Sequence, residues 1–81
     1  MKELHLTIVS PERTVFDGNV TQVTFPGKQG RFEVLPGHAP LISILDSGDI
    51  GYSVGTEAQT LTVKGGFVEV GRKEVSVCVE L

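Results

Sequence analysis

The sequence predicts an all-β protein, a flattened antiparallel β-sandwich or barrel of about eight to ten short strands. Apolar residues recur at every second position through most of the chain, which is typical of strands with one buried face. Turn signals rich in glycine, proline and aspartate interrupt this alternation about every eight to twelve residues. Helical periodicity is absent. Because the 81 residues contain no linker and no internal repeat, we expect a single domain over residues 1–81.

The N-terminal segment predicts two strands. The first covers residues 4–9, because its alternate apolar side chains share one face, and Ser10-Pro11-Glu12 ends it by removing a backbone donor and setting a turn. A short second strand covers residues 14–17 and closes at Gly18.

A third strand is expected at residues 19–25, which are rich in valine and threonine. The apolar phase of this segment shifts between Val20 and Val23, and the shift predicts a β-bulge. Pro26-Gly27 and Gly30 then bracket a loop.

The middle of the chain predicts two extended segments joined by a proline-rich loop. Residues 31–35 are extended because they lie between Gly30 and Pro36. The next strand, Leu41 to Leu45, is apolar on both faces. It is therefore either a central strand of the sheet or a strand with one face in an interface.

Four further strands are expected in the C-terminal half, because turn signals at residues 46–49, 55–58 and 71–73 separate its alternating segments. These strands cover residues 50–54, 59–64, 67–70 and 74–80. The side chains expected to point inward are Ile50, Tyr52, Val54, Leu61, Val63, Val75, Val77 and Val79. Gly65-Gly66 predicts a tight turn or bulge where two backbones approach closely.

The proline-rich loop is the most distinctive segment. Pro36 and Pro40 fix their own φ angles and hold the preceding residues extended, while Gly37 can adopt positive φ. Such a loop has little freedom to lose on docking, which favours a role in presenting His38 and Ala39 to a partner. The alternative is an ordinary connection between two strands.

Composition excludes several classes of function. The net charge of −3 and the scattered lysines and arginines provide no basic stripe, so nucleic acid is not an expected partner. Cys78 is the single cysteine, which excludes an internal disulfide and fits a reducing compartment. No leader peptide is visible, and no apolar stretch approaches the ~20 residues that span a bilayer. Any membrane association is expected to be indirect.

No catalytic, cofactor-binding or metal-binding residue is predicted. His5 lies within a strand, where a surface or hydrogen-bonded histidine is expected, and Asp46 and Asp49 fit a solvated turn. Gly65-Gly66 follows Lys64 and does not precede a Lys-Ser or Lys-Thr pair, so the sequence has no phosphate-binding P-loop. We therefore expect a protein that is not an enzyme and uses no cofactor.

Four segments, in this order along the chain, resemble one known family. They are Leu6-Thr7-Ile8-Val9-Ser10-Pro11-Glu12 with Phe16-Asp17-Gly18, Pro36-Gly37-His38-Ala39-Pro40-Leu41, Leu45-Asp46-Ser47-Gly48, and Val63-Lys64-Gly65-Gly66-Phe67-Val68-Glu69-Val70. Together they are similar to the N-terminal β-sandwich of the ε subunit of F-type ATP synthases, the subunit called δ in mitochondria.

The resemblance implies a non-catalytic subunit of the central stalk. In that family the sandwich clamps the rotating γ subunit onto the ring of membrane c subunits and couples proton flow to ATP synthesis. The implied location is peripheral, on the cytoplasmic face of the bacterial inner membrane. The implied contacts with the c ring are Arg31, Glu33, Pro36, Gly37, His38, Ala39 and Pro40. The implied contacts with γ are Ser10, Leu41, Ile42, Ser43, Gly65 and Gly66.

The chain departs from the family at Arg31, because many members have an acidic residue after the glycine that corresponds to Gly30. Glu33, on the same strand face, is the alternative source of a carboxylate. In much of the family two helices that can block ATP hydrolysis follow the sandwich. This sequence ends at Leu81, where they would begin. If Leu81 is the natural C-terminus, we expect a subunit that couples without inhibiting by that route; the alternative is a truncated chain.

Two other classes of function remain open on the residues alone. Lipoyl and biotinyl carrier domains are also flattened β-sandwiches of similar size, and Lys64 is the lysine near a candidate hairpin tip. Its neighbours Val63 and Gly65 do not match the flanks of a modified lysine. A hydrolase with an unrecognised site is the third class.

Overall fold

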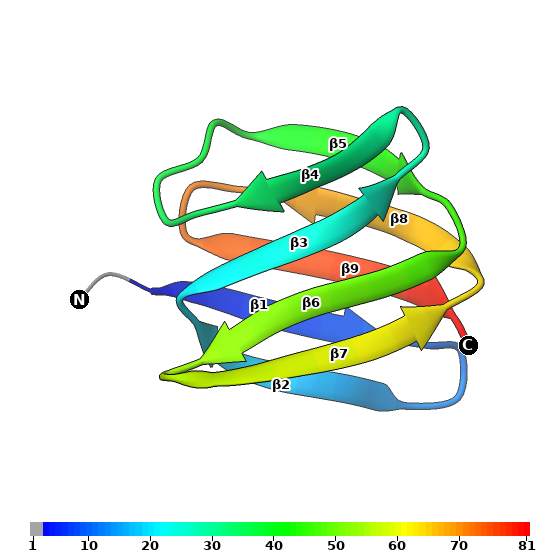
Figure 1. Ribbon diagram of the computed structural model, residues 1–81, viewed down its shortest axis with the longest axis horizontal. Coiled ribbons are helices and arrows are strands. Elements are labelled where there is room, and N and C mark those ends of the chain that lie inside the picture. The colour runs from blue at the N-terminus through cyan, green and yellow to red at the C-terminus, as the bar shows by residue number, and fades with distance from the viewer. Residues whose placement is uncertain (1–2) are drawn as a thin grey trace.

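The computed structural model describes residues 3–81, which form nine β-strands (Figure 1). The strands are β1 (Leu4–Val9), β2 (Thr14–Val20), β3 (Gln22–Gly27), β4 (Gly30–Val34), β5 (Leu41–Leu45), β6 (Gly48–Val54), β7 (Glu57–Val63), β8 (Gly65–Val70) and β9 (Glu74–Glu80).

The strands form one curled sheet that folds into two layers. Their order is β2-β1-β9-β8-β5-β3-β6-β7, with β4 paired to β3. The curl occurs between β5 and β3, which share the single pair Gly27–Leu45. A front layer of β3, β4, β6 and β7 therefore covers a back layer of β2, β1, β9, β8 and β5 (Figure 1). The predicted all-β sandwich is confirmed, with one parallel pair, β1 and β9, among the antiparallel ones.

The core lies between the layers and follows the predicted alternation. In β9, Val75, Val77 and Val79 are buried while the residues between them are exposed. Aromatic rings add two contacts between neighbouring elements. The Phe25 and Phe32 ring centroids lie 5.5 Å apart, and those of Phe16 and Tyr52, from β2 and β6, lie 4.6 Å apart. The second pair joins the two layers on the side opposite the curl.

The boundary between the second and third strands was predicted wrongly. β2 continues through Gly18 as far as Val20, because Gly18 pairs with Leu6 inside the ladder. Val20 and Val23 therefore lie on two different strands, separated by a bend at Thr21. The shift in apolar phase marks this boundary and no bulge lies there. An irregularity occurs instead in the β1–β2 pairing, between Ile8 and Val9.

The turns predicted at residues 46–49 and 55–58 are shorter than expected, because β6 and β7 begin earlier, and β8 also begins earlier than expected. Gly48 and Glu57 already pair with the neighbouring strand, whereas we expected both in turns. Val54, predicted to point inward, is 40% exposed because it ends β6 beside the turn. Gly65-Gly66 opens β8 and does not form a turn. The predicted close approach of backbones is confirmed, since a Cβ on Gly66 would collide with the backbone of Cys78.

Candidate functional site

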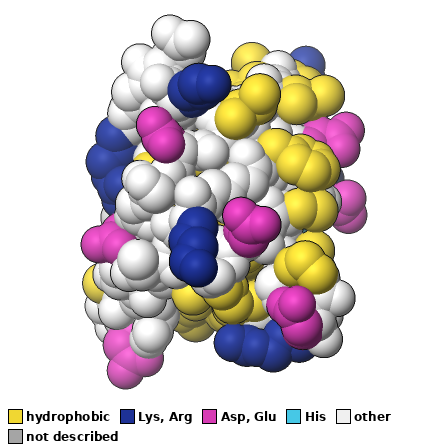
Figure 2. Space-filling view, turned by 90° about the vertical axis from the view of Figure 1, so that its right-hand side faces the viewer, with side chains coloured by type: hydrophobic (Ala, Val, Ile, Leu, Met, Phe, Trp, Pro, Cys, Tyr) yellow, Lys and Arg dark blue, Asp and Glu magenta, His cyan; other side chains and the backbone are white. Residues whose placement is uncertain are grey.

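The outer face of the back layer carries an exposed apolar patch. The strand register places Ile44 opposite Phe67 and Phe67 opposite Cys78, on neighbouring strands. Ile42 lies two residues before Ile44, on the same side of β5. The exposed fractions are 74% for Ile42, 61% for Ile44 and 49% for Phe67, and Cys78 is also exposed. We call these four residues the apolar strip. Figure 2 shows hydrophobic side chains gathered along this side of the molecule, at the right of the view.

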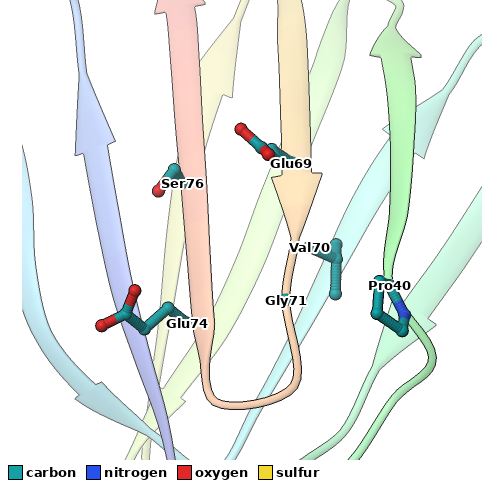
Figure 3. Close-up of a pocket in the computed structure, with 6 residues that line it drawn as sticks. All are labelled: Pro40, Glu69, Val70, Gly71, Glu74 and Ser76. Carbon is teal, nitrogen blue, oxygen red and sulfur yellow. The ribbon is translucent and has the colours of Figure 1, made fainter.

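Two shallow grooves meet beside the apolar strip. One, of about 320 Å³, is lined by Pro40, Glu69, Val70, Gly71, Glu74 and Ser76 (Figure 3). The other, of about 330 Å³, is lined by Pro40, Leu41, Ile42, Glu69 and Val70. They share Pro40, Glu69 and Val70, so the groove that contains the two glutamates continues into the apolar strip at Ile42.

The structure divides the predicted γ contacts on β5 between two faces. Ile42 points outward, within the apolar strip. Leu41 and Ser43 are half-buried and pair with Val70 and Val68, which belong to the core. β5 is therefore apolar on both faces, as predicted, and its outer face is the exposed one.

The other predicted γ contacts lie at one end of the back layer. Ser10 follows the end of β1, where its Oγ accepts a hydrogen bond from the Arg13 backbone N–H at 3.3 Å. Gly65 and Gly66 begin β8, next to Phe67. The end of β1 and the start of β8 lie at the same end of the layer (Figure 1). Ser10, Gly65 and Gly66 thus flank the end of the apolar strip that contains Phe67.

The proline loop lies at the opposite end of the molecule from that glycine pair (Figure 1). Gly37 has a φ of 85°, as its predicted freedom allows. The loop is held by backbone hydrogen bonds from the Gly37 N–H to the Arg72 carbonyl at 3.4 Å and from the His38 N–H to the Leu35 carbonyl at 3.0 Å. His38 is half-buried, and its Nδ1 lies 2.7 Å from the Ala39 carbonyl oxygen. Its side chain is not part of the hydrophobic core.

The predicted c-ring contacts do not form one cluster. Arg31 and Glu33 both point outward from β4, but Arg31 lies near the start of that strand and the proline loop follows its end. The Arg31 guanidinium donates hydrogen bonds to the Asp49 carbonyl at 2.6 Å and to Thr24 Oγ1 at 2.9 Å. It is therefore already bonded within the front layer.

One polar cluster surrounds His5 on the outer face of the back layer. The His5 Nδ1 lies 3.1 Å from Asn19 Oδ1, and its Nε2 lies 2.6 Å from Asp17 Oδ1. The hydrogen bonds to Asn19 and then Asp17 raise the pKa of His5 above its ordinary value of 6.5, and the charges of Asp17 and Glu74 add to this effect. These side chains are exposed surface groups, arranged to stabilise an imidazolium.

The carrier-domain alternative required Lys64 to lie near a hairpin tip, and the structure does not place it there. β7 and β8 belong to different layers and do not pair with each other, so Lys64 lies in a crossover and not at a hairpin tip. Its backbone N–H donates to the Glu80 carbonyl at 2.7 Å. Among residues 3–81, no group of three or more histidine, cysteine, aspartate or glutamate side chains is arranged to hold a metal ion. No helix in that range is long and apolar enough to cross a bilayer.

Sequence reasoning did not single out Phe67, Glu69 and Glu74 as parts of a surface. Alternation in the two strands places all three outward, but only the register brings them beside Ile42 and Ile44. The sequence predicts that two backbones approach closely at Gly65-Gly66, and Phe67 is the next residue. This position is the one signal in the sequence that could have drawn attention to Phe67.

Comparison with known proteins assigns the chain to a family. A family profile described as "ATP synthase, Delta/Epsilon chain, beta-sandwich domain" matches residues 3–81. The ATP synthase epsilon chain of Nitratidesulfovibrio vulgaris is 42% identical over 79 residues, which are 98% of this chain and 59% of that protein. The epsilon chain of Rhodopseudomonas palustris is 38% identical over 81 residues, or 100% of this chain and 60% of that protein. The chain thus spans about three fifths of the length of these relatives.

Solved structures show the same fold. A chain of the Euglena gracilis mitochondrial ATP synthase superposes with a TM-score of 0.91 at 21% identity, covering 98% of this chain and 51% of that one. A chain from the central stalk and c ring of the Tetrahymena thermophila mitochondrial enzyme gives a TM-score of 0.81 at 14% identity, covering 100% of this chain and 67% of that one.

Proposed function

The chain belongs to the ATP synthase delta/epsilon chain family, as its β-sandwich domain, and we propose that it acts as a central-stalk subunit that clamps γ onto the c ring. In this role it turns with both partners and transmits torque between proton flow and ATP synthesis. It contributes rigidity and contact surface and takes no part in the chemistry of ATP. The proposed location is the cytoplasmic face of the bacterial inner membrane, reached through the c ring.

The observation that carries the proposal is the apolar strip. Ile42 and Ile44 are large β-branched side chains that project into solvent from β5, the end strand of the back layer, and they contribute nothing to the buried core. Contiguous exposed apolar patches on small proteins mark interaction surfaces. We assign this face to γ, with Ser10 and the Gly65-Gly66 pair at one end of the contact.

The c ring is assigned to the proline loop and the outward side of β4. Residues Pro36–Pro40 form a connection whose two prolines limit the entropy lost on docking. Glu33 is the carboxylate available to a basic loop of the ring, since Arg31 is bonded to Asp49 and Thr24 within the domain. A sandwich with one face on γ and one rim on the ring can hold the two together.

Co-purification with the γ subunit of the same organism tests the assignment of the apolar strip. Ile42→Glu and Ile44→Glu should each release γ, because a carboxylate would be buried without a partner in an apolar contact. Thr60→Glu is the matched control, since Thr60 is exposed on β7 in the front layer. Retention of γ by both isoleucine variants would show that γ binds elsewhere.

A further inference from the structure

The strands of both layers carry more acidic than basic side chains, and those of the front layer contain Arg31 together with Glu33, Asp49 and Glu57. The five strands of the back layer, β1, β2, β5, β8 and β9, contain no lysine or arginine. Their outward-pointing acidic residues are Asp17, Glu69, Glu74 and Glu80. His5 is the one titratable cationic side chain of these strands; Asp17 pairs with it at 2.6 Å, and Glu74 also faces it. The middle of the face that carries the apolar strip is therefore acidic, while Arg13, Lys64, Arg72 and Lys73 lie in the turns at its ends.

The acidic groups and the apolar strip are parts of one continuous surface. Figure 3 shows Glu69 on β8, Ser76 and Glu74 on the neighbouring β9, and Pro40 just before β5. The groove between them has a volume of about 320 Å³, within the range of small ligand pockets, about 300–1,000 Å³. Its charged side chains are the two carboxylates, and the Ser76 hydroxyl can both donate and accept a hydrogen bond. Glu69 and Pro40 also line the second groove, which reaches Ile42.

We propose that the partner docked on this face inserts a lysine or arginine side chain into the groove between Glu69 and Glu74, while large apolar side chains beside that cation cover the apolar strip. The inference rests on the proposed function, in which the partner is γ, and it adds the chemistry by which γ is recognised. The apolar strip supplies contact area. The groove selects a partner with a cationic side chain and, by holding that cation, fixes where along the strip the partner lies.

Charge complementarity selects this partner over the other occupants of an apolar face. A second copy of the chain would bring Glu69 and Glu74 against an equally acidic surface, and like charges at an interface are strongly unfavourable. An anionic membrane or a nucleic acid would be repelled in the same way. A protein segment that carries both a basic side chain and large apolar side chains matches the acidic groove and the apolar strip together.

The experiment measures the affinity of the chain for purified γ as a function of salt. Glu69→Gln and Glu74→Gln remove one carboxylate each without changing side-chain size, and Glu69→Lys reverses the charge. Glu57→Gln and Glu57→Lys are the matched controls, because Glu57 is exposed on β7 in the front layer. We expect each glutamine variant at the groove to raise Kd about three- to tenfold and Glu69→Lys to raise it further, with a weaker salt dependence than the wild-type chain. The Glu57 variants should leave Kd unchanged.

A zero-length carbodiimide reaction provides a second readout. It joins a carboxylate to a lysine amine only where the two are in contact, so a γ lysine in the groove should become linked to Glu69 or Glu74. The link should be lost in the matching glutamine variant. An arginine in the groove gives no link, and the salt-dependent change in Kd then carries the test alone.

The outcomes separate this inference from the proposed function. If γ binds wild type, Ile42→Glu abolishes binding, and the groove variants bind with unchanged Kd and salt dependence, the face is correct and the groove inference is wrong. If wild-type chain does not bind γ at all, the proposed function itself fails. If Glu57 variants lose as much affinity as Glu69 variants, the effect reflects overall charge, and the inference is again overturned.

Discussion

The Arg31 guanidinium donates a hydrogen bond of 2.6 Å to the backbone carbonyl of Asp49 and so joins β4 to β6 across the intervening strand β3. The same guanidinium also donates a hydrogen bond of 2.9 Å to Thr24 Oγ1 on β3. Gly51 leaves room for this arrangement, since a Cβ there would lie 2.9 Å from Thr24 Oγ1 and 3.7 Å from the Arg31 guanidinium. Arg31 thus has bonding partners inside its own domain.

Arg31→Ala should therefore lower the free energy of unfolding. Two hydrogen bonds to an exposed guanidinium contribute about 0.5–1.5 kcal/mol, measured as a shift in the urea midpoint. Arg72→Ala serves as the control, because Arg72 lies in the β8–β9 turn and has no side-chain hydrogen bond among those of residues 3–81. An equal loss of stability in both variants would contradict the structural role of Arg31.

The glycine pair that opens β8 should tolerate substitution at only one of its two positions. Gly66 has a φ of 152°, and its missing Cβ faces the backbone of Cys78 and Val79. Gly66→Ala should cost more than about 3 kcal/mol, a large part of the roughly 4–12 kcal/mol expected for a domain of this size. Gly65→Ala is the matched control, because its Cβ would lie 3.6 Å from the Leu45 carbonyl, an ordinary contact. Thermal unfolding of the two variants checks the difference.

The fold could be predicted from the sequence because a strand that is buried on one face has an alternating pattern. β9 shows this most clearly, with Val75, Val77 and Val79 inward. The same rule failed at Val20 and Val23, where two strands meet at one bent residue and the alternation restarts without a glycine or proline. Local pattern alone cannot distinguish a restart of this kind from a bulge.

The candidate site could be predicted only in part. The proline loop and the apolar character of residues 41–45 are local properties, and both were visible in the sequence. The neighbourhood of Ile44, Phe67 and Cys78 depends on the pairing of three strands that are distant in sequence. Pairing register is set by the packing of the whole domain, so the apolar strip and its acidic groove emerge only from the structure.

Ser43 is a poor position for testing the γ contact, although the sequence analysis placed it there. Ser43 is half-buried and pairs in register with Val68, which is fully buried, so Ser43→Arg directs a charge toward the core. We expect this variant to lose about 1–3 kcal/mol of stability, whereas Ile42→Arg stays within about 0.5 kcal/mol of wild type because Ile42 is 74% exposed. Chemical denaturation distinguishes them. A stable Ser43→Arg protein would place that side chain outside the core.

The His5 cluster should make stability depend on pH. Because hydrogen bonds to Asn19 and Asp17 raise the folded-state pKa of His5 above 6.5, its contribution is fully present below that pH and is lost as pH rises through the folded-state pKa. Asp17 and Glu74 are the charged groups that face the imidazole. The stability difference between wild type and His5→Gln should shrink as pH increases. A difference that grows with pH would reverse this assignment.

Substitution of Asp17 offers a direct check on the same cluster. Asp17→Asn removes the charge and leaves Asn19 in place, so the pKa of His5 should fall toward its ordinary value. Proton NMR of the imidazole ring follows the titration in the folded protein. An unchanged titration in this variant would mean that Asp17 does not stabilise the imidazolium.

We assign His38, in the proline loop, to docking on the c ring. Its imidazole is half-buried at the surface of the proline loop and contacts the Ala39 carbonyl, outside the hydrophobic core. His38→Ala should therefore leave the urea midpoint within the range of ordinary surface substitutions, about 0.5 kcal/mol. In the reconstituted ATP synthase it should reduce coupling between proton flow and ATP turnover modestly, as expected for one or two lost contacts.

Gly37→Ala provides a contrasting variant, because the φ of 85° at Gly37 strains any other residue and alters the whole loop. Coupling should then fall further than in His38→Ala. If His38→Ala unfolds the isolated chain while coupling in the assembled enzyme is unaffected, the histidine supports the loop from within and is not a docking residue.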